Sequence, residues 1–230
     1  SMPSSSGRSV HPSASPDPRS IRWFPAVGSI IGALVALATR IGTGIDPWTG
    51  ALAGLVAWVA ITGALHLDGL ADIADAAGAA HKGPDRVRAV LADPHVGSFG
   101  AVTVTLQLIA KLLLLHALAE RDLFLPLILI PFAARIGPLC WARWLPSLHD
   151  GLGARFRDAI RPVDIAMAGI ALLIAAWWWP GLLAAPLLML LWGRWLRDRI
   201  GGISGDGHGA GIELVESGLL FALLLADRLT

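Results

Sequence analysis

A short stretch of this chain, HLDGLADIAD, carries an imidazole and three carboxylates directly after an apolar run. On a helix, Asp68, Asp72 and Asp75 stand at i, i+4 and i+7, within about 60° of one face. Three like charges on one stripe repel one another unless a cation neutralises them. Carboxylate oxygens are the ligands that Mg²⁺ and Mn²⁺ prefer, so the spacing predicts a divalent metal site on this face.

The neighbours of these acids leave alternatives open. His66 lies about 160° from the Asp face of a continuous helix, which favours a contact with substrate or with a metal ligand over direct coordination. Gly69 allows the helix to break after Asp68, which would then cap the following helix. The three acids could also do no more than solvate a helix end, although ionisable residues at membrane depth indicate function by default.

A second stretch, residues 201–216 with the sequence GGISGDGHGAGIELVE, combines six glycines with three acids. Glycines let backbone amides approach an anion closely, and a helix beginning near Gly209 would aim the positive end of its dipole at that point. Asp206 lies in the expected loop, whereas Glu213 and Glu216 share one helix face and need a metal, imidazole or basic partner. A flexible connector is the alternative interpretation of the glycines.

Basic residues accompany the acids. Lys82, Arg86 and Arg88 follow the first stretch, where they suit phosphate capture as well as a signal for membrane topology. Arg135 lies within an apolar run, where a guanidinium needs an anionic partner such as bound substrate or one of the acids. Carboxylates, a divalent metal and cationic side chains at a bilayer surface together predict phosphoryl transfer.

The elements that must position these residues are membrane helices. The chain has 230 residues, of which 55% are hydrophobic and 15% charged, and its mean hydropathy is +0.64. A net charge of +1 gives no reason to expect nucleic acid as a partner. We predict an all-α, polytopic helical bundle with six or seven transmembrane helices. The candidate spans are about 23–39, 48–66, 99–119, 123–141, 163–179, 181–195 and 212–227.

Charge distribution predicts the orientation of these spans. With the N-terminus inside, 13 of the 18 Lys and Arg residues fall on the inner side. The segments 67–98, 142–162 and 196–211 then all face the cytoplasm. The Ser- and Pro-rich residues 1–22 predict a disordered tail, followed by a single transmembrane catalytic domain over residues 23–230.

Four motifs together resemble the cobalamin synthase family, the adenosylcobinamide-GDP ribazoletransferases. They are TGALHLDGLADIADA (62–76), LADPHVGSFGAVTV (91–104), GLGARF (151–156) and GGISGDGHGAGIELVE (201–216). The resemblance implies a multi-pass enzyme of the bacterial inner membrane with its active site on the cytoplasmic side. Such an enzyme joins adenosylcobinamide-GDP to α-ribazole or its 5′-phosphate with Mg²⁺, releasing GMP and forming adenosylcobalamin or its 5′-phosphate.

From the residues and this resemblance together we expect roles for individual residues. Asp68, Asp72, Asp75 and Asp206 are the expected metal ligands. Asp75 is the candidate general base, with Glu213 as the alternative, and His66 is a further catalytic candidate. The expected substrate-binding residues are Lys82, Arg86, Asp93, His95, Gly97, Arg135, Gly205 and Glu216. His95 departs from the family, which often has a basic residue at this place, and a permanent charge there is therefore in doubt.

Two other classes compete with this hypothesis. A divalent-ion carrier also uses acidic residues, but it would place them near mid-span and often show two similar halves. A CDP-alcohol phosphotransferase would use related chemistry on a lipid substrate and release CMP. The sequence leaves open whether the chain forms a homo-oligomer.

Overall fold

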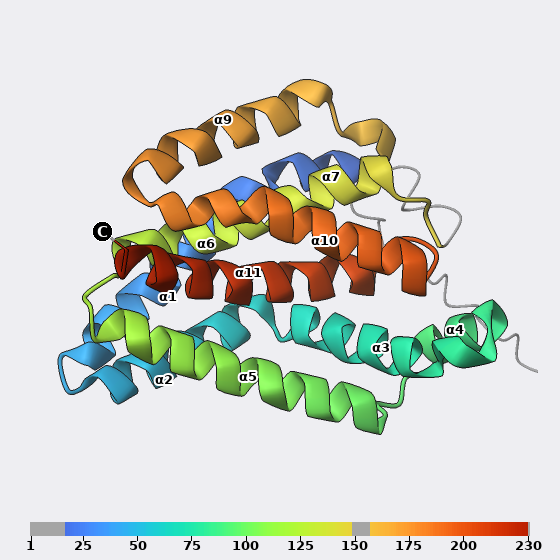
Figure 1. Ribbon diagram of the computed structural model, residues 1–230, viewed down its shortest axis with the longest axis horizontal. Coiled ribbons are helices and arrows are strands. Elements are labelled where there is room, and N and C mark those ends of the chain that lie inside the picture. Colours follow the sequence, from blue (N-terminus) through green and yellow to red (C-terminus); the bar gives the residue numbers. More distant parts are fainter. Residues whose placement is uncertain (1–16, 149–156, 230) are drawn as a thin grey trace, which may run out of the picture.

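The computed structural model describes residues 17–148 and 157–229, and this part of the chain is helical without a strand (Figure 1). The fold class predicted from the sequence is therefore confirmed. The elements are η1 (Pro18–Trp23), α1 (Phe24–Thr43), α2 (Pro47–Thr62), α3 (Leu65–Ala79), η2 (Ala80–Lys82), α4 (Pro84–Leu91), α5 (Ser98–Ala119), α6 (Leu125–Ala134), α7 (Ile136–Trp144), α9 (Pro162–Trp178), η3 (Pro180–Leu183), α10 (Ala184–Arg199) and α11 (Gly205–Asp227).

Fewer helices are long and apolar enough to cross a membrane than the six or seven expected. Within the described residues there are four, or five if the bent pair α2 and α3 counts as one span. The difference lies in α9, which is apolar but has only 17 residues, and in α10, which ends in a charged turn. The four segments are Arg19–Thr43, Ser98–Ala119, Leu125–Trp144 and Gly205–Asp227.

A sharp bend separates α2 from α3, so the expected span 48–66 is not one straight helix. The two helices meet at 83°. Gly63 and Ala64 both adopt left-handed backbone conformations, with φ of 60° and 58°, and these end α2. Helix α3 then continues unbroken through Gly69, so the alternative in which the helix breaks after Asp68 is wrong.

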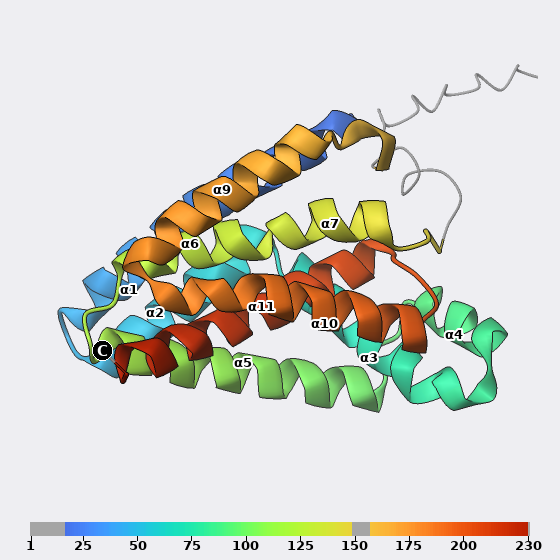
Figure 2. The same ribbon diagram turned by 45° about the horizontal axis from the view of Figure 1, so that its top comes forward.

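Helix α11 lies at the centre of the bundle and packs against α3, α5, α6 and α10 (Figures 1 and 2). Its contact with α3 is very close. A Cβ added at Gly69 would lie 2.8 Å from Asp206 Cα, and one at Gly209 would lie 3.2 Å from His66 Cα. Glycine is needed at this crossing because any side chain would push the two helices apart.

Most of the glycine-rich stretch belongs to α11, and only residues 201–204 form the connection before it. The helix begins at Gly205, one turn earlier than expected, because the Ser204 hydroxyl caps it by accepting from the Gly207 amide at 3.1 Å. The expectation of a helix beginning near Gly209 was therefore wrong. Gly201 and Gly202 lie in the connection as expected, whereas Gly205, Gly207 and Gly209 are helical, and Gly209 serves the close packing of two helices.

The residues just before α1 are ordered, although they fall in the tail predicted over 1–22. Residues 18–23 form η1, in which Asp17 caps the first turn and Ile21 is buried. Arg22 pairs with Asp164 at the start of α9. The capping and the buried Ile21 explain the difference, and the earlier part of the predicted tail lies outside the described residues.

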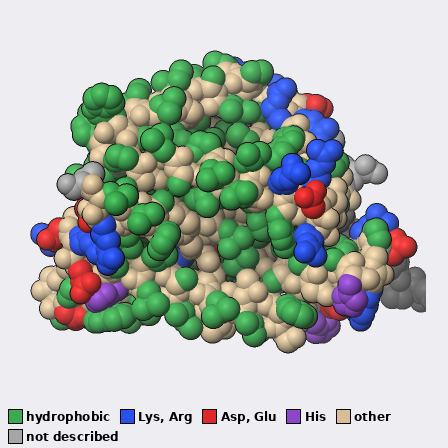
Figure 3. Space-filling model, in the orientation of Figure 1, with side chains coloured by type: hydrophobic (Ala, Val, Ile, Leu, Met, Phe, Trp, Pro, Cys, Tyr) green, Lys and Arg blue, Asp and Glu red, His purple; other side chains and the backbone are tan. Residues whose placement is uncertain are grey.

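The bundle has two polar ends and an apolar middle. Figure 3 shows apolar side chains over the middle of one face, with most Lys, Arg, Asp and Glu gathered toward its two ends. The described parts of the segments 67–98, 142–162 and 196–211 lie at one end, where α3, α4, α7, α10 and the start of α11 meet (Figures 1 and 2). The C-terminal end of α11 lies at the other end.

A single methyl group tests the crossing of α3 and α11. We expect Gly69→Ala to lower the free energy of unfolding by about 1 to 3 kcal/mol, because its Cβ would overlap the Asp206 backbone. Gly169→Ala in α9 is the matched control, since a Cβ there meets nothing within 4 Å and brings the same gain in helix propensity. Thermal unfolding in detergent compares the two variants, and equal stability would contradict the close crossing.

Candidate active site

An acidic cluster forms where α3 crosses the first turn of α11. We use this name for Asp68, Asp72, Asp75 and Asp206. The negative charges of Asp206, Asp68 and Asp75 all act on the half-buried Asp72 carboxyl, with Asp206 contributing most. The two acidic stretches singled out in the sequence therefore meet at one place.

Asp75 has a defined position within this cluster. Its two carboxylate oxygens accept hydrogen bonds from the backbone amides of Gly97, at 2.7 Å, and Gly100, at 3.0 Å. These amides belong to the start of α5, so the carboxylate caps that helix from a neighbouring element. The expected substrate contact Gly97 is thus in direct contact with Asp75, and the role of Asp75 as a general base stays a prediction.

The chemistry of the cluster fits a divalent cation. Within the described residues, Asp68, Asp72 and Asp206 have no ion-pair partner, so no protein cation offsets the repulsion among them, although the Ser204 hydroxyl donates to Asp206 at 3.4 Å. Hard carboxylate oxygens suit Mg²⁺, which commonly completes its shell with substrate phosphates. In the described part of the chain, no three acidic, His or Cys side chains converge enough to hold a metal by themselves.

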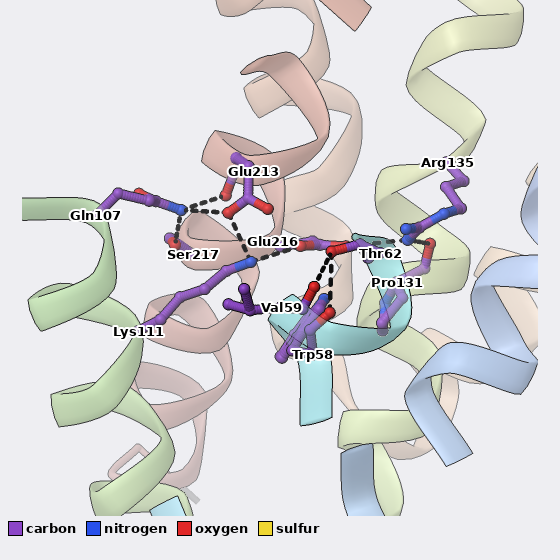
Figure 4. A network of polar contacts seen from close by, with 10 residues as sticks. All are labelled: Trp58, Val59, Thr62, Gln107, Lys111, Pro131, Arg135, Glu213, Glu216 and Ser217. Carbon is purple, nitrogen blue, oxygen red and sulfur yellow. Dashed lines mark hydrogen bonds and ion pairs between the residues drawn. The ribbon is translucent and has the colours of Figure 1, made fainter. Parts of the chain in front are cut away.

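A second group of charges lies deeper in the bundle and pairs internally (Figure 4). Lys111 on α5 contacts Glu213 and Glu216 on α11, each at 2.7 Å. Arg135, between α6 and α7, contacts Glu216 at 3.0 Å, and the Gln107 amide donates to Glu213 at 3.0 Å. All five side chains are buried. We call these five residues the buried ion network.

The buried ion network is distinct from the acidic cluster. Glu213 lies seven residues after Asp206 on the same helix, which is about 10 Å along its axis. The sequence indicated that Arg135 needs an anionic partner, and the structure supplies Glu216. Gln107 and Lys111 were missed as functional candidates, although a lysine within an apolar run is itself a signal for a buried carboxylate partner.

The remaining predicted contacts lie on the surface beyond α3. Lys82 and Arg86, on η2 and α4, are exposed. His95 is also exposed. The pKa of the Asp93 carboxyl is held below its usual range, mainly by the hydrogen bond from the His95 side chain. Gly205 is exposed at the first position of α11, and the motif GLGARF lies outside the described residues. The described contacts do not join Lys82, Arg86, Asp93 or His95 to the acidic cluster, whereas Gly205 directly precedes Asp206 in the chain.

Fold and site together define a polytopic helical membrane protein with unpaired carboxylates at one end of its bundle. A family model described as cobalamin-5-phosphate synthase matches residues 9–224. The chain belongs to this family.

Curated relatives agree with the family assignment. A protein of Novosphingobium aromaticivorans is 61% identical over 90% of this chain and 84% of its own length. Proteins of Thiobacillus denitrificans and Laribacter hongkongensis are 51% and 46% identical, covering 90% and 91% of this chain and 83% and 86% of their own lengths. All three are named adenosylcobinamide-GDP ribazoletransferase. No solved structure matches the chain.

Removing one of the two cations of the buried ion network tests the contribution of the network to stability. We expect Lys111→Met to lower the free energy of unfolding by about 3 to 5 kcal/mol, because it leaves two buried carboxylates with too little positive charge. Arg88→Met is the control, because it breaks an exposed pair with Asp85 that is worth at most about 1 kcal/mol. Unfolding by denaturant in detergent measures both, and similar losses in the two variants would show that the network is energetically neutral.

Proposed function

We propose that this chain transfers the adenosylcobinamide phosphate moiety of adenosylcobinamide-GDP to α-ribazole or its 5′-phosphate. The products are GMP and adenosylcobalamin or its 5′-phosphate, in the nucleotide loop assembly step of cobalamin synthesis. Membership in the cobalamin-5-phosphate synthase family carries this proposal. The acidic cluster at the crossing of α3 and α11 supplies a site suited to a charged diphosphate and its metal.

The acidic cluster would hold Mg²⁺ through Asp68, Asp72 and Asp206. The metal, when bound, neutralises charge on the diphosphate and on the departing GMP. The cluster has repelling carboxylates without protein cations, and the diphosphate oxygens would complete the shell that these side chains leave open. Lys82 and Arg86, exposed on η2 and α4, would meet the phosphates as substrate approaches.

The proton of the attacking ribazole hydroxyl needs an acceptor. Asp75 is the candidate because it belongs to the acidic cluster and its orientation is fixed by the Gly97 and Gly100 amides. Glu213 is a weaker alternative, since Lys111 and Gln107 already bind its carboxylate inside the bundle. The hydroxyl oxygen would attack the phosphorus on the cobinamide side, and the bond from this phosphorus to the GMP oxygen would break.

The buried ion network gives no support to the alternative of an ion carrier. It does lie within apolar helices, where a carrier would place its charges. However, Lys111 and Arg135 together neutralise Glu213 and Glu216, and the space beside Lys111 and Glu213 is too small for a water molecule. These residues therefore hold helices together without providing an open ion path.

We also propose an orientation in the inner membrane, with the acidic cluster facing the cytoplasm. The positive-inside rule supports it. Described basic residues at or near the end with the acidic cluster are Arg19, Arg22, Lys82, Arg86, Arg88, Arg143, Arg157, Arg161, Arg194, Arg197 and Arg199, and those at the other end are Arg40, Arg121 and Arg228.

GMP release tests the proposed reaction. Purified protein with adenosylcobinamide-GDP, α-ribazole and Mg²⁺ should release GMP, and chelation of the metal should stop the release. We expect Asp72→Asn to lower kcat by about 100-fold or more, because it removes a charge that binds the metal on the reacting diphosphate. Asp85→Asn, in an exposed ion pair on α4, is the control and should keep full activity.

Two results would contradict this account. The proposed reaction would be excluded if the wild-type protein released no GMP but released CMP from a CDP-alcohol. Normal turnover and normal Mg²⁺ dependence in Asp72→Asn would remove Asp72 from the metal site while leaving the reaction itself in place.

Cysteine labelling tests the orientation. The only cysteine is Cys140, so Cys140→Ser provides a background without thiols. In intact spheroplasts, a membrane-impermeant maleimide should label Glu120→Cys, at the end away from the acidic cluster. It should label Arg88→Cys only after permeabilisation, because α4 would face the cytoplasm. The opposite pattern would invert the topology.

A further inference from the structure

A cavity of about 340 Å³ shares Arg135 with the buried ion network and includes no residue of the acidic cluster. Residues of η1 and α1 form one wall, and the other side is formed by Thr62 at the end of α2, His66 on α3 and Arg135. The α1 wall includes Phe24 and Val27, so most of the cavity is apolar. A cavity of this size takes a side arm or ring of a ligand and not a whole substrate.

Two polar atoms among the lining residues have no partner. Arg135 is 3% exposed, and its Nη1 donates to Glu216 and to the Pro131 carbonyl, whereas its Nη2 has no hydrogen bond. The Nδ1 atom of His66 is also buried without a partner. Buried polar groups are almost always satisfied, so an unsatisfied nitrogen on each of two residues that line one apolar cavity indicates a missing polar partner.

The charges around Arg135 indicate what kind of partner fits. Two cations, Lys111 and Arg135, already balance the two carboxylates of Glu213 and Glu216. An additional anion would carry excess charge into an apolar cavity and would lie on the same guanidinium as Glu216. A neutral carbonyl oxygen accepts from Nη2 without this repulsion.

A primary carboxamide fits both unsatisfied atoms. Its oxygen accepts from Arg135 Nη2, and its other hydrogen-bonding atoms can pair with His66 Nδ1 in either tautomer of the ring. A carbonyl of an ester offers only an acceptor. We propose that this cavity binds a primary carboxamide of the corrinoid substrate, a class of group that cobinamide carries on the periphery of its ring. This inference rests on the proposed function, which supplies the corrinoid.

The position of the cavity agrees with such a role. His66 precedes Asp68 by two residues on the continuous helix α3, so the cavity lies at nearly the same depth as the acidic cluster, about 160° around that helix from the Asp face. Ser20 and Trp23, both in η1 just before α1, are exposed and line the cavity. A ligand could therefore enter the cavity from the protein surface at these two residues. Amide binding here would orient a large ring whose reacting phosphate lies at the acidic cluster.

Filling the cavity without touching its charges tests the proposal. Val27→Phe adds bulk on the α1 wall, and Ser20→Trp does so independently from η1. Leu34→Phe is the control, because Leu34 lies two turns further along α1, is 45% exposed compared with 46% for Val27, and does not line the cavity. Equilibrium dialysis of cobinamide against each purified protein measures binding without requiring turnover.

We expect both filling variants to weaken cobinamide binding about tenfold, the amount expected from one lost hydrogen bond with its packing, and Leu34→Phe to leave it unchanged. A corrinoid whose peripheral amides are hydrolysed to acids should bind the wild-type protein more weakly than cobinamide and lose little more in Val27→Phe. This second comparison separates a carboxamide site from a general anion site.

A lipid carbonyl is the competing occupant, and reconstitution distinguishes it. Three results together would show that the cavity holds a lipid and would overturn the proposal. The wild-type protein would be more stable in ester-linked than in ether-linked phospholipid, Val27→Phe would remove that difference, and cobinamide binding would be the same in both proteins. Equal cobinamide binding by all variants overturns it as well. Failure of GMP release with cobinamide binding as expected would refute the proposed reaction but not the carboxamide site.

Discussion

A charge in the apolar interior of a membrane protein must be neutralised by the protein itself, and α11 carries two such charges one turn apart. Glu213 and Glu216 pair with Lys111 of α5 and with Arg135 between α6 and α7. Because these pairs cross between helices, they fix the rotation of α11 about its axis as well as its position. With that rotation fixed, the first turn of α11 presents Asp206 to α3, where Gly69 permits the close contact.

The acidic cluster depends on this anchoring because its own electrostatics oppose it. Asp72 is repelled by Asp206, Asp68 and Asp75. Separation of α3 from α11 would relieve that repulsion, but Gly69 and Gly209 let the two helices pack without intervening side chains. Helix packing and the buried ion network therefore hold together carboxylates that repel one another, and a divalent cation would relieve the repulsion that remains.

Sequence periodicity predicted what depends on local spacing, and long-range packing decided the rest. The continuous Asp face of α3 and the need of Arg135 for an anionic partner followed from the residues themselves. The bend between α2 and α3 did not, because Ala64 rarely adopts a left-handed conformation and nothing in its side chain signals it. The start of α11 was also missed, since the sequence alone does not distinguish glycines that serve close helix packing from glycines that serve a loop.

The two sets of acids on α11 show how depth separates structure from chemistry. Glu213 and Glu216 lie where neither water nor substrate reaches, and each has a protein cation. Asp206 lies at the end of the same helix, where described residues give it no cation. A carboxylate left unpaired costs little at a polar end and is free to bind an external cation, whereas the same residue two turns deeper would have to be paired. The neutral middle of α11 therefore allows the proposed reaction chemistry to reside at its end.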